Sequence, residues 1–91
     1  MIKPAIGMIE TKGLTALVMA TDAMLKAAAV EFMGWKKIGS GMCSSYIRGD
    51  VAAVRTALDA GVAIAQEVGQ IVCAQVLSRP HDDIHSMVPK R

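Results

Sequence analysis

Residues 30–48 read VEFMGWKKIGSGMCSSYIR, and this stretch decides the fold. Apolar residues are interspersed with charged ones from Val30 to Ile38, which predicts a strand, and Met42 to Arg48 resumes as a second strand. The break between them is Gly39-Ser40-Gly41, a loop flanked by glycine on both sides. The two strands therefore form a hairpin or a near-hairpin around this loop.

A strand and a helix are predicted upstream of the hairpin. Residues 5–11 form a short apolar stretch that ends at the turn Lys12-Gly13. From Leu14 to Ala29 the apolar residues recur at spacings of three and four in an alanine-rich background, which favours a helix. Its expected buried stripe contains Leu14, Leu17, Val18, Thr21, Leu25 and Ala28.

A helix and a strand are predicted again downstream. Asp50 suits the N-cap of the helix, because its carboxylate can accept hydrogen bonds from the free amides of the first turn. Gly69 is a fitting C-terminal stop, and residues 71–77 form a last strand that is mostly buried. A short tail helix is expected to start near His81. The expected apolar stripe of the downstream helix contains Val51, Val54, Leu58, Val62 and Ala65.

The predicted order is strand, helix, strand, strand, helix, strand. Elements of this length in this order favour an α+β fold of the ferredoxin-like, split β-α-β type. We expect a four-stranded antiparallel sheet with two main helices on one face, a short C-terminal helix, and a single domain over residues 1–91.

Composition excludes several classes of protein. The chain has 91 residues, 53% of them hydrophobic, and a formal net charge of +2, which is incompatible with a disordered coil. The longest run without Asp, Glu, Lys or Arg covers residues 68–78, short of the roughly 20 residues that a bilayer requires. Lys90 and Arg91 supply the net charge, and the other charges are scattered. Neither a membrane nor a nucleic acid is therefore expected as a partner.

The hydrophobic fraction consists mainly of small or flexible side chains. The sequence contains fourteen alanines and seven methionines but only three aromatic residues, Phe32, Trp35 and Tyr46. A domain of this size buries only about 60% of its unfolded surface, and small side chains reduce the gain further. We therefore expect an obligate oligomer, whose subunit interfaces bury what the monomer cannot.

Few residues point to catalysis or to a cofactor. His81 and His85 stand four apart and could share a helix face, but they lack a clear third ligand for zinc. Asp82 and Asp83 between them suit the first turn of a helix after Pro80, and we favour this interpretation. No metal, other cofactor or catalytic residue is therefore expected.

The cysteines and the aromatic residues also have simple interpretations. Cys43 and Cys73 lie on apolar segments without metal-site or CxxC spacing, so we expect free thiols in a reducing cytoplasm. The N-terminal residues lack the pattern of a signal peptide. Trp35 and Tyr46 could stack nucleic-acid bases, but packing at an interface is the favoured role.

Five motifs in register resemble one family. The order and spacing follow the bacterial microcompartment shell proteins, in their single-domain hexamer-forming class, from about residue 5 to residue 89. The motifs are Gly7-Met8-Ile9-Glu10-Thr11-Lys12-Gly13-Leu14, Asp22-Ala23-Met24 with Lys26-Ala27-Ala28, Lys37-Ile38-Gly39-Ser40-Gly41, Arg48-Gly49-Asp50-Val51 and Arg79-Pro80-His81.

The resemblance implies a homohexamer without catalytic activity that tiles into the facets of a cytoplasmic shell around metabolic enzymes. Its partners would be copies of itself, other shell proteins including pentamer-forming vertex proteins, encapsulated enzymes, and small polar metabolites. The residues implied at the central pore are Lys37, Ile38, Gly39, Ser40 and Gly41. The residues implied at the edge between hexamers are Asp22, Lys26, Arg79 and His81.

The predicted architecture and its loop also permit an alternative function. A regulatory oligomer of the same architecture could hold a small anion at the loop of residues 39–41. The sequence also departs from the family at Met42-Cys43-Ser44-Ser45-Tyr46 and at Trp35, where a tyrosine is common. These departures lie beside the loop, so the surroundings of the implied pore are expected to differ from those of other members.

Overall fold

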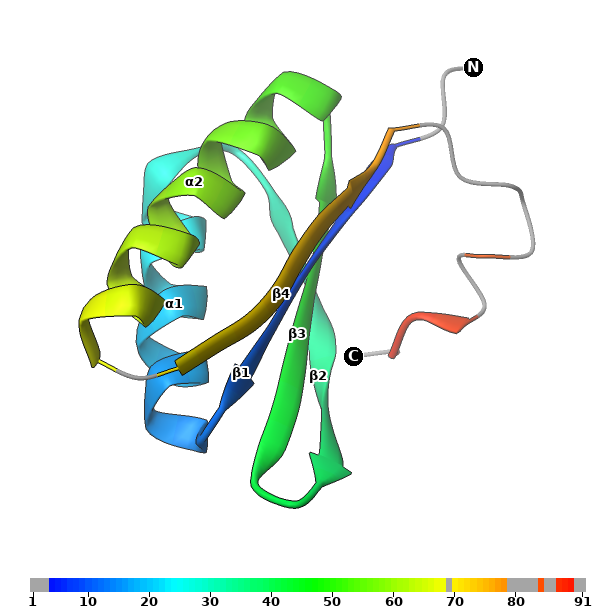
Figure 1. Ribbon diagram of the computed structural model, residues 1–91. Coiled ribbons are helices and arrows are strands. Elements are labelled where there is room, and N and C mark those ends of the chain that lie inside the picture. Colours follow the sequence, from blue (N-terminus) through cyan, green and yellow to red (C-terminus); the bar gives the residue numbers. More distant parts are fainter. Residues whose placement is uncertain (1–3, 69, 79–83, 85–86, 90–91) are drawn as a thin grey trace.

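The computed structural model describes residues 4–68, 70–78, 84 and 87–89, and in them strands alternate with helices in the expected order (Figure 1). Each boundary lies within two residues of the sequence-based expectation. The elements are β1 (Ala5–Lys12), α1 (Leu14–Ala27), β2 (Glu31–Gly39), β3 (Met42–Gly49), α2 (Val51–Val68) and β4 (Gln70–Leu77).

The four strands form one antiparallel sheet in the order β2-β3-β1-β4. Both helices cover the same face of this sheet, as Figure 1 shows. The predicted α+β class, the four-stranded antiparallel sheet and the two main helices are thereby confirmed. Because β2 and β4 are its two edges, the molecule has two different sides, one where α1 and β2 line a common hollow and one where α2 and β4 do.

The residue before each helix is held by a hydrogen bond, to the β2–β3 loop for α1 and within the first turn for α2. Gly13 adopts a φ of 100°, a backbone conformation that favours glycine, and its amide donates to the carbonyl of Gly41 at 2.6 Å. Asp50 caps α2 as expected: its Oδ2 accepts from the amide of Ala52 at 3.2 Å. The Asp50 carbonyl accepts from the amide of Val54 at 2.9 Å, which closes the first helical turn.

The core lies between the helices and the sheet and is built around Ile9, Met24, Ile47 and Val54, all fully buried. The helices approach each other closely at Gly61, where an added Cβ would meet the Cγ of Met24 at 2.7 Å. Small residues at this crossing let the helix backbones pack tightly. The predicted buried stripe of α2 is confirmed at Val54, Leu58 and Ala65.

The expected burial of the apolar residues on α1 was wrong in part. The helix buries Ala16, Leu17, Ala20 and Met24, whereas Leu14, Val18 and Leu25 are exposed. The reason is the close helix crossing, which favours the alanine-bearing side of α1 as the inner face. Leu14, Val18 and Leu25 consequently point away from the core.

The expectation of a mostly buried last strand also needs correction. Among the side chains of β4 that the structure describes, Ile71, Cys73, Ala74 and Val76 are half-buried, and Leu77 is 45% exposed. The cause is topological, because β4 is an edge strand that pairs only with β1. An apolar run in an edge strand has a neighbour on one side only, so part of it stays in contact with solvent.

The sheet face opposite the helices is covered in part by residues from the end of the chain (Figure 1). Val88 is buried, and the Nζ of Lys36 donates to the carbonyl of Met87 at 3.3 Å. Pro89 packs against Gly34, where a Cβ would meet its ring at 2.8 Å. The tail helix expected near His81 lies mostly outside the described residues. No helix in the described part of the chain is long and apolar enough to cross a membrane.

Candidate functional sites

The loop of residues 39–41 is an exposed turn at one end of the β2–β3 hairpin (Figure 1). Gly39, Ser40 and Gly41 all have positive φ, of 119°, 53° and 78°. No atom lies within 4 Å of a Cβ built on either glycine, so the backbone conformation rather than space favours glycine here. The loop therefore presents backbone amides, backbone carbonyls and one hydroxyl to its surroundings.

The remaining predicted pore residues lie at the same end of the molecule. Lys37 is exposed one residue before Ile38, whose side chain is 53% exposed. The hydrogen bond from Gly13 to Gly41 joins the loop to the start of α1. The structure thus brings all five predicted pore residues together at one tip of the molecule.

The predicted edge residues Asp22 and Lys26 form an ion pair on α1. Lys26 Nζ and Asp22 Oδ2 are 2.9 Å apart, and both side chains are mostly exposed. The hydrogen bond with Asp22 and the attraction of its charge raise the pKa of Lys26 above its ordinary value. A 14-residue helix is about 20 Å long, so Lys26 lies far from the loop, which neighbours the start of α1. Arg79 and His81 lie outside the described residues.

The structure also bears on the predictions for metal binding and for the two cysteines. Within the described ranges, no cluster of three His, Cys, Asp or Glu residues could hold a metal ion, and His81 and His85 fall outside those ranges. Cys43 and Cys73 are both free. Cys43 is buried, with its Sγ 3.7 Å from the Oγ1 of Thr11.

Trp35 and Tyr46 lie on opposite faces of the sheet. Trp35 pairs with Ser45, whose Oγ accepts a hydrogen bond from Thr21 of α1, so Trp35 lies on the helix side of the sheet. Tyr46 pairs with Gly34 on the other side, where it helps to line a groove with Lys36 and Met87. Trp35 and Tyr46 therefore do not form a joint stacking platform for nucleic-acid bases, which requires aromatic side chains on one sheet face.

Sequence reasoning missed one surface, which we call the α1–β2 surface. It contains four large apolar side chains that are 41–58% exposed, Leu14, Val18, Leu25 and Trp35. They surround a hollow of about 380 Å³ that Leu17, Thr21, Asp22 and Phe32 also line. A signal is present in the sequence, because apolar residues occur on more than one face of α1, but their spacing alone does not show which face is buried. Exposed apolar patches of this kind mark interaction sites.

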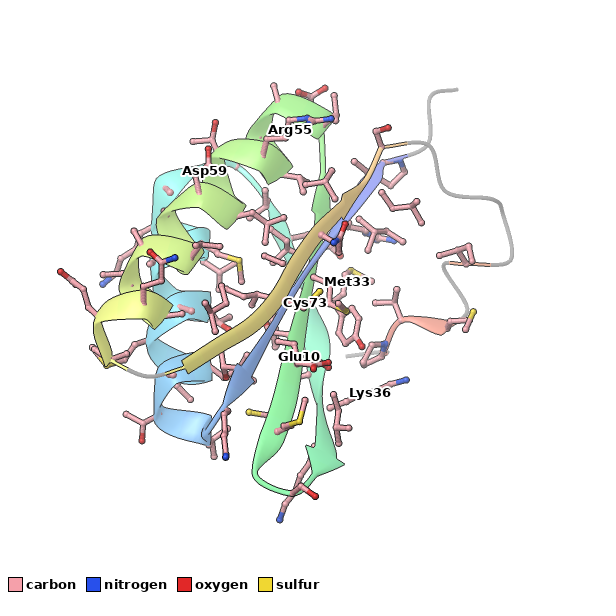
Figure 2. All side chains as sticks on the ribbon, viewed as in Figure 1. Glu10, Met33, Lys36, Arg55, Asp59 and Cys73 are labelled. Atoms are coloured by element: carbon pink, nitrogen blue, oxygen red, sulfur yellow. The ribbon has the colours of Figure 1, made fainter. Side chains whose placement is uncertain are left out.

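A second hollow, of about 370 Å³, lies on the opposite side of the molecule, between α2 and β4. We call it the α2–β4 hollow. Figure 2 shows Arg55 and Asp59 on α2 at this side of the molecule. The lining residues are Arg55, Leu58, Asp59, Val62, Ala74 and Val76.

Comparison with known proteins finds relatives along nearly the whole chain. Residues 5–80 match the BMC domain family. The chain is 53% identical over 85 residues to the bacterial microcompartment shell protein EutM of Salmonella typhimurium, with 93% of this chain and 88% of that protein covered. It is 50% identical over 90 residues to the bacterial microcompartment shell protein PduA of Citrobacter freundii, with 99% and 97% covered.

The fold is also similar to that of a solved protein. A crystal structure of a microcompartment protein from Desulfitobacterium hafniense superposes with a TM-score of 0.82 and 31% sequence identity. The superposition covers 91% of this chain and 45% of that chain. The sequence motifs and the fold therefore lead to the same group of proteins.

Proposed function

The chain belongs to the BMC domain family, and on this premise we propose that it is a structural shell protein of a bacterial microcompartment rather than an enzyme. The observation that carries the proposal is about 50% identity to two shell proteins over nearly the full length of this chain.

The functional unit of the proposal is a homohexamer in which the loops of residues 39–41 meet at a six-fold axis. The α1–β2 surface supports self-association, because its large apolar side chains are 41–58% exposed in the described part of the chain. The position of the loop at one exposed tip supports its place at the axis. Six loops can approach one another closely there because Gly39 and Gly41 have no side chains.

The loops would line a narrow pore for small polar metabolites. A solute that enters the pore exchanges part of its hydration for backbone amides and the hydroxyl of Ser40. An apolar or bulky molecule gains no such compensation for lost water. The exposed ammonium of Lys37 adds a positive potential near the mouth, which favours anions and polar solutes.

The opposite end of α1 is the proposed contact between hexamers. Asp22 and Lys26 are exposed there, and Arg79 and His81 complete the set by resemblance. Further partners in the proposal are other shell proteins, including pentamer-forming vertex proteins, and the encapsulated enzymes.

The proposal also includes the domain bounds and the type of fold. We assign residues 1–91 to one BMC domain of the ferredoxin-like, split β-α-β type with a short C-terminal helix. The strand order β2-β3-β1-β4 and the helix between the strands of each half support this assignment.

The proposal is tested by the assembly state of the purified protein. Sedimentation velocity at micromolar concentration is expected to give a mass six times that of the chain, and electron microscopy is expected to show sheets or tubes. A monomer under these conditions would overturn the proposal.

A further inference from the structure

We propose that Trp35 of one copy inserts into the α2–β4 hollow of the next copy, between Arg55 and Asp59. This inference rests on the proposed homo-oligomeric ring and identifies the contact that closes it. Trp35 is 47% exposed on edge strand β2, although it is the largest apolar side chain in the sequence.

Ring symmetry determines which surfaces must meet. A closed ring of identical subunits needs a head-to-tail interface, in which one surface of each copy contacts a different surface of the next. The two sides of this molecule meet that condition, because β2 with α1 and β4 with α2 lie at opposite edges of one sheet. In the proposed ring, the α1–β2 surface of one copy faces the α2–β4 hollow of its neighbour.

The register of the sheet places Trp35 in the same row as Ala74, which lines the hollow. Trp35 pairs with Ser45, Ser45 with Ile9, and Ile9 with Ala74, so these four residues form one row across the sheet. Directly paired residues point to the same face, and Trp35 and Ala74 therefore both lie on the helix side. When the β2 side of one copy approaches the β4 side of the next, Trp35 meets the floor of the hollow at Ala74.

The chemistry of the hollow fits an indole. Ala74 and Val76 provide an apolar floor, and Leu58 and Val62 an apolar wall. Arg55 and Asp59 stand four apart and are both exposed. Figure 2 shows both of them on α2. The guanidinium of Arg55 can lie over the face of the indole ring, and the carboxylate of Asp59 can accept from the indole N–H. A tryptophan needs one apolar surface and one acceptor when buried, and the hollow offers both.

Trp35 is the only tryptophan in the sequence, so its fluorescence reports directly on this contact. In the assembled full-length protein, emission is expected at short wavelength and quenching by acrylamide is expected to be weak. Dilution or mild urea that separates the copies should shift the emission to longer wavelength and increase quenching. Both changes should follow the loss of assembly measured by sedimentation.

Two substitutions test the pairing. Arg55→Gln is expected to weaken association by roughly two- to thirtyfold and to increase the quenching of Trp35, because the cation over the ring is lost. Lys12→Gln, which removes another exposed cation outside the hollow, is the matched control. It should change neither the association nor the quenching of Trp35. In a double-mutant cycle, Trp35→Ala and Arg55→Gln should be coupled by at least about twofold in the association constant. Circular dichroism of each variant checks that the fold is retained.

The outcomes separate the two proposals. Rings in which Trp35 is fully accessible to acrylamide, or in which the two substitutions act independently, would overturn the insertion of Trp35 and leave the shell function intact. A protein that stays monomeric would overturn both.

Discussion

At the residue scale, the ion pair between Asp22 and Lys26 is more informative about assembly than about stability. Both partners are mostly exposed, and exposed pairs of this kind contribute little to folding. The raised pKa of Lys26 means that the pair's small contribution is present below the ordinary lysine pKa and is lost as the pH rises through the raised value. Lys26 therefore keeps its charge at neutral pH and is available for a contact between hexamers.

The substitution Lys26→Ala is expected to abolish sheets and tubes in electron microscopy while sedimentation still shows hexamers. The physical reason is that Lys26 lies at the end of α1 remote from the loop, is mostly exposed, and does not line the hollow of the α1–β2 surface. Lys12→Ala removes a lysine that is also exposed and serves as the control, with sheets retained. Sheets that persist without Lys26 would contradict its place at the edge.

At the element scale, the start of α2 depends on a single side chain. The carboxylate of Asp50 accepts from the amide of Ala52 at 3.2 Å, and an alanine cannot replace this bond. We expect Asp50→Ala to destabilise the protein by about 1 kcal/mol, with a lower midpoint in thermal denaturation. Asp50→Asn, which keeps the acceptor oxygen, should recover most of the loss. Because assembly also affects stability, all variants must be compared at one protein concentration.

The positions of the helices and strands could be predicted from local sequence, but the burial of some of their side chains could not. Glycines at 13, 39 and 41 and the cap at Asp50 fix where elements begin and end, and these signals are local. The outward direction of Val18 depends on the helix crossing at Gly61, which involves a residue 43 positions later in the chain. The exposure of Leu77 depends on strand order in the same way.

At the scale of the whole molecule, the proposed pore and the proposed contact between hexamers lie toward opposite ends of α1, and Asp22 also lines the hollow of the α1–β2 surface. The loop with Gly39 and Gly41 is at one tip, the Asp22–Lys26 pair is at the far end of α1, and the sides carry the α1–β2 surface and the α2–β4 hollow. The loop motif could be predicted from sequence because its residues are consecutive. The side surfaces could not, since each combines a helix with an edge strand distant in sequence.

This separation predicts that the pore can be changed without loss of the ring. Ser40→Leu places six bulky apolar side chains where six hydroxyls stand in the proposed hexamer. The flux of a small polar metabolite into intact shells should fall, because the opening narrows and the hydroxyls no longer compensate for lost water. The measurement is the initial rate of an encapsulated enzyme whose substrate is added outside the shells.

The matched variant is Ser40→Gly, which also removes the hydroxyl but leaves the opening wide and suits the φ of 53° at this position. It should keep most of the flux if pore width dominates and lose as much as Ser40→Leu if the hydroxyl dominates. Broken shells should restore the full rate in both variants, since the enzyme is then directly accessible. An unchanged rate in intact Ser40→Leu shells, with hexamers verified by sedimentation, would show that metabolites do not cross the shell at the loop of residues 39–41.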